Sequence, residues 1–573
     1  MLARLLRAEE PSLFTRGPWD DVPDAELPTP PLREGLGHAH LRVSTHVPLA
    51  QAYFDQGLNL LHLGWGPEAR RAFAEAARQD PSLAMAWWGL ALTRGAGGRF
   101  SADRAQAIHK ALALAEGVTD REQRYIVAAS LLADKGPANG RQAFIREMEH
   151  HIDRHPEDAE ARLLLAGFLM DGYEPDGRPG SGQPYAQALL RELLRTHPHH
   201  EGVHFAWVAA MLGSGRPEAA KDSALWLLSL AARASPCLLG AGRLLQRIGL
   251  TEQAREAFQG AIEADEAWLA QEKLPVTAAP AAAEAMRLLV STCAEAGRYT
   301  EGQAWARRLR THVEAAGQGQ AVVLVACALA GLHLRFGFGR AAADVRVELD
   351  AEAPAAERGL LEGLRCYTRA LAALEAGRIG EVEKACASLE ALQQMLAEGR
   401  RAEGQALCPR DVARVVEVAA DELRGSLEAR RGDAARAEAT FIRAVRLERR
   451  LRTAGPAPFS RPARESLARA RLRFGRVEKA LELALELAAE RPGSGHARFL
   501  VAETRVAQGS FPEAVLDFAS FLERWRQADP HLPELQRAQA FMAGRGRYLR
   551  VVGGEASKVP PLKIVRARAK VLG

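Results

Sequence analysis

Residues 53–81 read YFDQGLNLLHLGWGPEARRAFAEAARQDP, and the spacing of small and large residues in this stretch predicts how it folds. Small residues, Gly57 and Ala69, would let two antiparallel helices approach closely. A proline, Pro81, would end the second helix. The other positions of the pattern are Tyr53, Leu60, Phe73 and Ala76, and the larger of these side chains would fill the seam. We therefore predict a helical hairpin in this stretch.

The pattern recurs along the chain and resembles the tetratricopeptide repeat (TPR), a helical hairpin of about 34 residues. Matching residues stand at the same spacing in further units: Trp87, Leu90 and Ala91; Leu238, Gly242, Leu245, Ala254, Phe258 and Ala261; Gly425, Ala437, Phe441 and Ala444; and Ala480, Pro492, Ala514 and Phe518. The resemblance implies a TPR-type α-solenoid, a right-handed superhelix of antiparallel helix hairpins in which each repeat packs on its neighbours.

Apolar periodicity of helix length continues between these units, with short breaks at Gly, Asp or Pro. The periodic stretches are 119–134, 140–154, 157–171, 184–196, 279–297, 319–335, 355–375 and 379–397. Strand signals are nearly absent, because no useful length of chain alternates polar and apolar residues between two turns. We predict an all-α chain with roughly eight to ten hairpins.

Composition and pattern together divide the chain into five regions. An irregular arm rich in proline and acidic residues occupies 1–37, and a basic, flexible tail occupies 545–573. Between them we expect an N-terminal TPR-like array at 38–270, a degenerate helical-repeat section at 271–410 and a C-terminal TPR array at 411–544. Whether the solenoid is continuous through the weakly patterned section is left open by the sequence.

Composition and cysteine usage indicate the compartment. Charged residues make up 26% of the 573 residues and hydrophobic residues 47%, which is ordinary for a protein with a large core. The six cysteines stand singly, without a CxxC or CxxxC pair, and this favours buried free thiols. We find no apolar stretch of signal-peptide length, and the longest apolar run, 321–334, is too short to span a bilayer. We expect a cytoplasmic protein that makes no membrane contact.

Positive charge is concentrated in the tail. The formal net charge is +5, but residues 545–573 contain eight basic residues and one acidic residue, so the tail carries +7 and the rest of the chain −2. The tail has one aromatic residue, Tyr548, whereas binding of single-stranded nucleic acid uses several interleaved aromatics. We do not expect nucleic-acid binding, and the tail is the only candidate for it.

Five blocks of sequence resemble a bacterial family of histidine-marked TPR proteins whose activity is not settled. The blocks are HLRVST at 40–45, AQAYFDQGL at 50–58, DPSLAMAWWGLA at 80–91, DGRPGSGQP at 176–184 and HPHHEGVH at 197–204. The resemblance covers about residues 38–270. Most of the family's histidines are absent from this chain: Gly66, Val208, Pro236, Leu239 and Arg243 stand where histidines would be, while His40 and His204 persist. The resemblance therefore implies that binding by the TPR groove remains and that any family metal or cofactor site is lost.

One motif points to metal chemistry. Residues 200–204 spell HExxH, in which His200 and His204 would bind zinc and Glu201 would act as general base. A third ligand is missing, because Glu218 in an antiparallel hairpin would lie on the order of 15 Å from His204 at ~1.5 Å rise per residue. We therefore predict no metal, no cofactor and no enzymatic activity. A metal or cofactor carrier using His200 and His204, or a zinc hydrolase, remains the alternative that metal analysis would reveal.

A second group of histidines, His150, His151 and His155, is expected to lie solvated on a charged helix face. The best-defined repeat offers a polar strip beside its small position, formed by Gln51, Asp55, Asn59 and His62. In a TPR superhelix the first helices line the concave groove. We therefore predict a protein-interaction scaffold that binds a partner peptide or helix in this groove, with these four residues as candidate contacts.

Overall fold

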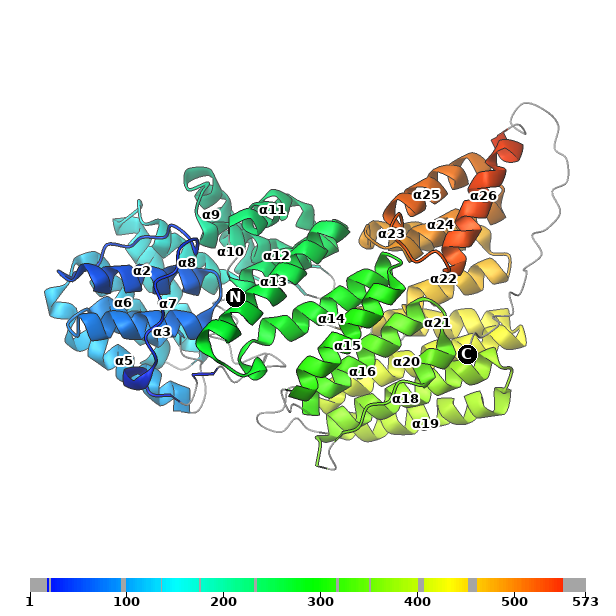
Figure 1. The fold of residues 1–573 in the computed structure, drawn as a ribbon, viewed down its shortest axis with the longest axis horizontal. Coiled ribbons are helices and arrows are strands. Elements are labelled where there is room, and N and C mark those ends of the chain that lie inside the picture. The colour runs from blue at the N-terminus through cyan, green and yellow to red at the C-terminus, as the bar shows by residue number, and fades with distance from the viewer. Residues whose placement is uncertain are drawn as a thin grey trace.

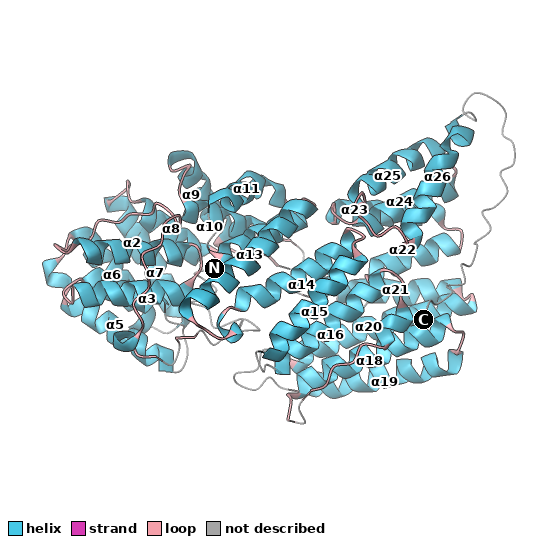
Figure 2. Ribbon diagram, viewed as in Figure 1, coloured by secondary structure: helices cyan, strands magenta, loops and turns pink. Residues whose placement is uncertain are grey.

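The computed structural model describes residues 18–19, 22–93, 99–134, 137–174, 177–230, 234–315, 319–349, 352–399, 407–451 and 461–549. Within these ranges it contains 25 α-helices, four short 3-10 helices and no β-strand (Figure 1, Figure 2). The prediction of an all-α chain is confirmed.

The helices up to residue 272 are α2 (Pro48–His62), α3 (Gly66–Gln79), α4 (Ala84–Thr93), α5 (Arg99–Ala113), α6 (Asp120–Asp134), α7 (Pro137–Arg154), α8 (Ala159–Leu169), α9 (Gln183–Thr196), α10 (Glu201–Leu212), α11 (Lys221–Leu230), α12 (Ser235–Arg247) and α13 (Thr251–Glu272). Those that follow are α14 (Pro280–Glu295), α15 (Tyr299–Ala315), α16 (Gly319–Arg335), α17 (Gly339–Ala343), α18 (Ala355–Glu375), α19 (Ile379–Glu398), α20 (Pro409–Arg431), α21 (Ala434–Arg450), α22 (Ala463–Arg473), α23 (Val477–Glu490), α24 (Gly495–Gln508), α25 (Phe511–Arg524) and α26 (Pro533–Leu549).

Consecutive helices pack in pairs, from α2 with α3 to α24 with α25, and α26 is left as a terminal helix. The described ranges therefore hold twelve hairpins, more than the eight to ten that we predicted. Each of the eight periodic stretches corresponds to one helix.

Packing inside the clear hairpins follows the predicted small and large positions. In three of them a glycine of the first helix lies so close to a phenylalanine of the second that an added Cβ atom would come within 3.0 Å of the ring. The pairs are Gly57 with Phe73, Gly242 with Phe258 and Gly425 with Phe441. Each phenylalanine is buried. The missing glycine side chain is therefore what allows the two helices to approach.

Replacing Ala69 with leucine tests this register. Ala69 is fully buried in the α2–α3 hairpin, so three extra carbon atoms should overpack the seam and lower the free energy of unfolding by roughly 1–3 kcal/mol. Thermal melts followed by circular dichroism measure the loss, and Ala188→Leu at an exposed position of α9 is the matched control. An unchanged melting curve for Ala69→Leu would contradict the assigned hairpin.

The stack of helices is uninterrupted through the section that the sequence left open. Helix α13 packs on α14, α14 on α16, α16 on α18 and α18 on α20. The helices between residues 251 and 431 thus form one continuous series, as Figure 1 shows.

Asp265, at the α13–α14 junction, is a buried carboxyl group that should make the stability of the fold depend on pH. Burial raises the pKa of Asp265 to about 7, although Ser235 and the Ala282 N–H oppose the shift, and the Oδ2 atom of Asp265 is buried without a hydrogen-bond partner. The folded protein thus keeps this proton to about pH 7, while the unfolded chain releases it near 3.8. Because the folded state binds more protons in this window, its stability falls as the pH rises.

We expect Asp265→Asn to remove this pH dependence. Between about pH 5.5 and about pH 8, at ~1.4 kcal/mol per pKa unit, the wild type should lose about 2 kcal/mol that the variant does not lose. Urea unfolding at the two pH values measures the difference. The exposed neighbour Glu266 gives a control, since Glu266→Gln should leave the pH dependence in place.

The N-terminal segment is extended and packs on the first hairpin. Helix α2 begins at Pro48. Apart from the 3-10 helix at Asp24–Glu26, the chain from residue 22 to residue 47 has no regular secondary structure, and it covers the described part of the predicted arm and the first ten residues of the predicted array. Leu27, Leu36 and Leu41 of this segment are buried. The segment is therefore part of the folded core of the first repeat.

The array before α14 curves until distant helices meet. Helix α10 contacts α2, and a Cβ atom on Gly202 of α10 would lie 2.6 Å from Cβ of His62. Trp65 packs edge-on against Trp268 of α13 at 5.5 Å between ring centroids. The inner helices of this array thus touch across the superhelix, so its interior is filled with side chains.

A second long-range closure joins the last helices to α14–α16. The indole of Trp525, which follows α25, donates to the Glu295 carbonyl at 3.0 Å. The Asp529 N–H donates to the Gly297 carbonyl, also at 3.0 Å. Apolar residues from both parts form one buried cluster that includes Phe336, Phe521 and Trp525. The C-terminal repeats are therefore held against the middle of the chain.

The C-terminal end of the chain and the burial of the cysteines differ in part from the prediction. Helix α26 runs to Leu549, so residues 545–549 of the predicted flexible tail are helical, and residues 550–573 lie outside the described residues. All six cysteines are unpaired, with Cys366 and Cys408 only half-buried and the other four buried. None of the helices in the described ranges combines the length and apolar character that a membrane crossing needs.

Candidate partner-binding face

The predicted polar strip lies on one face of α2, as the spacing of Gln51, Asp55, Asn59 and His62 requires. Three of these side chains turn to the extended N-terminal segment, and His62 turns to α8 and α10. All four are thus used by the chain's own residues.

Carboxamide side chains on this face bind the main chain of the N-terminal segment in pairs. Asn59 accepts from the Ala39 N–H and donates to the Ala39 carbonyl, both at 3.0 Å. Gln51 accepts from the Val43 N–H at 3.1 Å and donates to the Leu41 carbonyl at 3.0 Å. A carboxamide carries both a donor and an acceptor, which matches one exposed N–H and one C=O of an extended chain.

A third carboxamide does the same, and we did not predict it. Gln56 accepts from the Arg33 N–H at 2.8 Å and donates to the Pro31 carbonyl at 3.1 Å. It lies five residues after Gln51, off the strip that we selected by helical spacing. The sequence offered one signal for this role, namely that a single helix carries three carboxamides, Gln51, Gln56 and Asn59.

The bound segment alternates between buried and exposed residues. Ala39, Leu41 and Val43 are buried, while His40 and Arg42 between them are exposed. A period of two is the signature of an extended strand that packs one side on a surface. His40 also meets the face, with its Nδ1 atom 2.7 Å from Asp55 Oδ2. The α2 face therefore holds an extended peptide through both its main chain and alternate side chains.

The contact between segment and helix is incomplete. A cavity of about 270 Å³ lies between them. Its walls come from residues 32–33 and 36–39 on one side and from Ala52, Asp55, Gln56 and Asn59 on the other. Polar atoms of the α2 face thus border open space beside the bound segment.

Farther inside, His62 belongs to a buried ionic cluster where α2, α8 and α10 meet. The two oxygens of Glu160 lie 2.5 Å from His62 Nε2 and 2.9 Å from His200 Nε2. Burial would raise the pKa of Glu160, but the charges and hydrogen bonds of His62 and His200 outweigh burial and leave the pKa well below its ordinary value. The cluster ties the first inner helix to two later ones.

The HExxH residues do not converge on one point. His200 is the N-cap of α10, and it faces Glu160. His204 instead contacts Ser223 Oγ at 2.9 Å and the Pro198 carbonyl at 2.8 Å. Glu201 accepts from the N–H of His38 at 3.0 Å. Among the described residues we find no cluster of histidine, cysteine and carboxylate side chains arranged to hold a metal ion.

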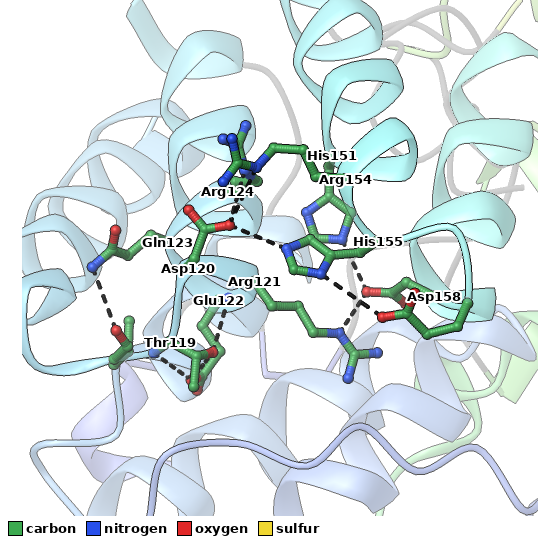
Figure 3. A network of polar contacts seen from close by, with 12 residues as sticks. Thr119, Asp120, Arg121, Glu122, Gln123, Arg124, His151, Arg154, His155 and Asp158 are labelled. Atoms are coloured by element: carbon green, nitrogen blue, oxygen red, sulfur yellow. Dashed lines mark hydrogen bonds and ion pairs between the residues drawn. The ribbon is translucent and has the colours of Figure 1, made fainter.

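The second histidine group is placed differently from our prediction of a solvated face. Figure 3 shows His151 and His155 beside Asp158 and Asp120. His151 is fully buried, and its Nε2 atom lies 2.9 Å from Asp158 Oδ2. His155 contacts Asp120 at 3.1 Å. The prediction was wrong for His151, because α8 packs over the end of α7 and brings its own N-cap carboxylate to the ring.

No protein-family model and no curated protein matches the chain. Among solved structures, the chain is similar to yeast Tom70, with 12% identity, 88% of this chain and 97% of that chain covered, and a TM-score of 0.34. It is also similar to the TPR domain of P58(IPK), with 14% identity, 70% of this chain and 100% of that chain covered, and a TM-score of 0.22. A third similar structure is a human IFIT1 dimer with m7Gppp-AAAA. It has 12% identity, 84% of this chain and 91% of that chain are covered, and the TM-score is 0.34. The assignment of a TPR-type α-solenoid rests on the hairpin packing described above.

Proposed function

We propose that the protein is an interaction scaffold that binds an extended segment of a partner protein on the α2 face. The main support is that the carboxamides of Gln51 and Asn59 bond to main-chain groups. Any extended polypeptide offers such groups, and the buried alternate positions add selection by side chains. The proposal needs no catalytic step, metal or cofactor.

Two further parts of the proposal concern origin and location. We infer kinship with the bacterial histidine-marked TPR family, supported by the shared blocks at 40–45, 50–58 and 197–204. These blocks form the bound segment, α2 and the start of α10, which lie together. A cytoplasmic location is supported by six unpaired cysteines, since thiols persist in a reducing compartment.

Affinity capture with chemical cross-linking tests the function. Full-length protein would be incubated with native cell extract, cross-linked and analysed by mass spectrometry. We expect a partner whose cross-links fall on residues 33–62, and we expect the Gln51→Leu, Asn59→Leu double variant to lose it. Gln106→Leu, at an exposed position of α5, is the matched control. Cross-links confined to the outer helices, or no retained partner, would contradict the proposal.

A further inference from the structure

Residues 34–43, which we term the strap, lie on the α2 face between two firmly held points. On one side, the half-buried Arg33 side chain meets Glu68 at 3.3 Å and lies over the Trp65 ring at 5.4 Å. On the other, the Ser44 N–H and hydroxyl donate to Glu122 at 2.7 Å and 2.5 Å. The chain before Arg33 is also anchored, because Arg70 donates to the carbonyls of residues 19 and 22.

The strap itself is held mainly by groups that any extended peptide would satisfy. Four of its hydrogen bonds join main-chain atoms to Gln51 and Asn59. The outer side of the strap is exposed to solvent. The His38 and His40 side chains contact Glu201 Oε1 and Asp55 Oδ2, each at 2.7 Å, yet 83% and 60% of these side chains remain accessible. Nothing in the described chain packs over this outer side in a way that would bury it.

Two glycines give the strap a point at which it can bend. Gly35 and Gly37 both have positive φ, at 76° and 137°, and a Cβ atom on Gly35 would have no neighbour within 4 Å. A Cβ atom on Gly37, in contrast, would lie 2.3 Å from Asn59 Oδ1. Glycine tolerates this backbone, and it retains more freedom than other residues. The strap can therefore lift while its two ends stay anchored.

We propose that the strap is a resident self-ligand of the α2 face, and that a partner's extended segment takes the face by replacing it. The proposal rests on the proposed function and adds its regulation. The incoming segment has small or aliphatic residues at alternate positions, like Ala39, Leu41 and Val43, because these positions are buried in the bound strap. The tethered strap competes at high effective concentration, so the free protein binds such segments weakly.

The test uses full-length protein and a fluorescent peptide with the sequence of residues 31–47 as the probe. In the chain, Gly37→Val should unseat the strap, because its Cβ atom would collide with Asn59, and should leave α2 intact. By fluorescence anisotropy we expect this variant to bind the peptide at least about tenfold more tightly than the wild type. Adding Asn59→Leu to the variant should abolish that gain, and a probe that itself carries Gly37→Val should bind neither protein tightly. Equal binding by wild type and Gly37→Val, or a gain that survives Asn59→Leu, would overturn the proposal.

Hydrogen exchange of the unaltered protein gives a second measurement that does not depend on a variant. If the strap lifts, the N–H groups of Ala39 and Val43 should exchange through a local opening, well before those in the middle of α2. Equal protection of strap and helix would show a permanent structural element and overturn the proposal. Neither measurement uses a cellular partner, so failure here is distinguishable from failure to capture one.

Discussion

Trp525→Ala is expected to release the C-terminal repeats from the middle of the chain and to lower the free energy of unfolding by ~3–5 kcal/mol. The indole is 1% exposed. It packs on Phe521 at 4.7 Å and on His496 at 5.1 Å between ring centroids. Its N–H also supplies a hydrogen bond to the Glu295 carbonyl. Alanine would leave a cavity where residues 525–529 pack on the α14–α15 turn.

Denaturant unfolding followed by tryptophan fluorescence and circular dichroism measures this loss. Hydrogen exchange should locate it, because amides of α24–α26 should lose protection while those of α2–α8 keep it. Leu516→Ala on α25 is the matched control, since this leucine is 71% exposed and its truncation should change stability by less than about 0.5 kcal/mol. Equal losses for the two variants would mean that the closure contributes little to stability.

Asp158→Ala should be as damaging in the N-terminal array. The carboxylate is buried and accepts hydrogen bonds from Arg121 at 2.6 Å, Tyr125 at 2.9 Å, His151 at 2.9 Å and the Ala161 N–H at 3.0 Å. Figure 3 shows Arg121 and His151 beside Asp158 at the start of α8. Removing one acceptor leaves several buried donors without a partner, at a cost of ~3–5 kcal/mol.

The same network predicts an acid dependence. Burial would raise the pKa of Asp158, but the hydrogen bonds from His151 and Arg121 outweigh it and hold the pKa well below its ordinary value. A lowered carboxyl pKa contributes stability above the unfolded value of about 3.8, and this stability is lost as the pH falls below it. The loss in free energy of unfolding caused by Asp158→Ala should therefore be complete at pH 7 and become smaller in acid. Glu157→Ala, with a side chain that is 75% exposed, should show neither effect.

Local sequence was sufficient for the helices and for the packing within each hairpin. The Gly57–Phe73 contact, and its equivalents at Gly242 and Gly425, could be predicted because their partners lie 16 residues away on the adjoining helix. Helix bounds such as 319–335 and 355–375 follow from the apolar period alone. The number of hairpins was underestimated because most of the described pairs lack the glycine–phenylalanine contact of the clear repeats.

The four residues of the polar strip lie on α2, but the sequence alone did not predict that three of them would contact the N-terminal segment. Buried Ala39, Leu41 and Val43 alternate with exposed residues. So short an alternating run does not predict a strand, because no second run that could pair with it stands nearby in the sequence. Whether such a run packs on a sheet, on a helix or on nothing depends on the surface that the rest of the fold offers.

The sequence by itself determined the repeat and the all-α architecture, since these depend on residues within one or two helical turns or one hairpin. Only the tertiary structure decided that His62 meets Glu160 and His200, that the strap occupies the α2 face, and that Trp525 reaches Glu295. The His62–Glu160 and Trp525–Glu295 contacts join residues 98 and 230 positions apart. They depend on small rotations between successive hairpins that add up along the superhelix, and no single residue pattern encodes that sum.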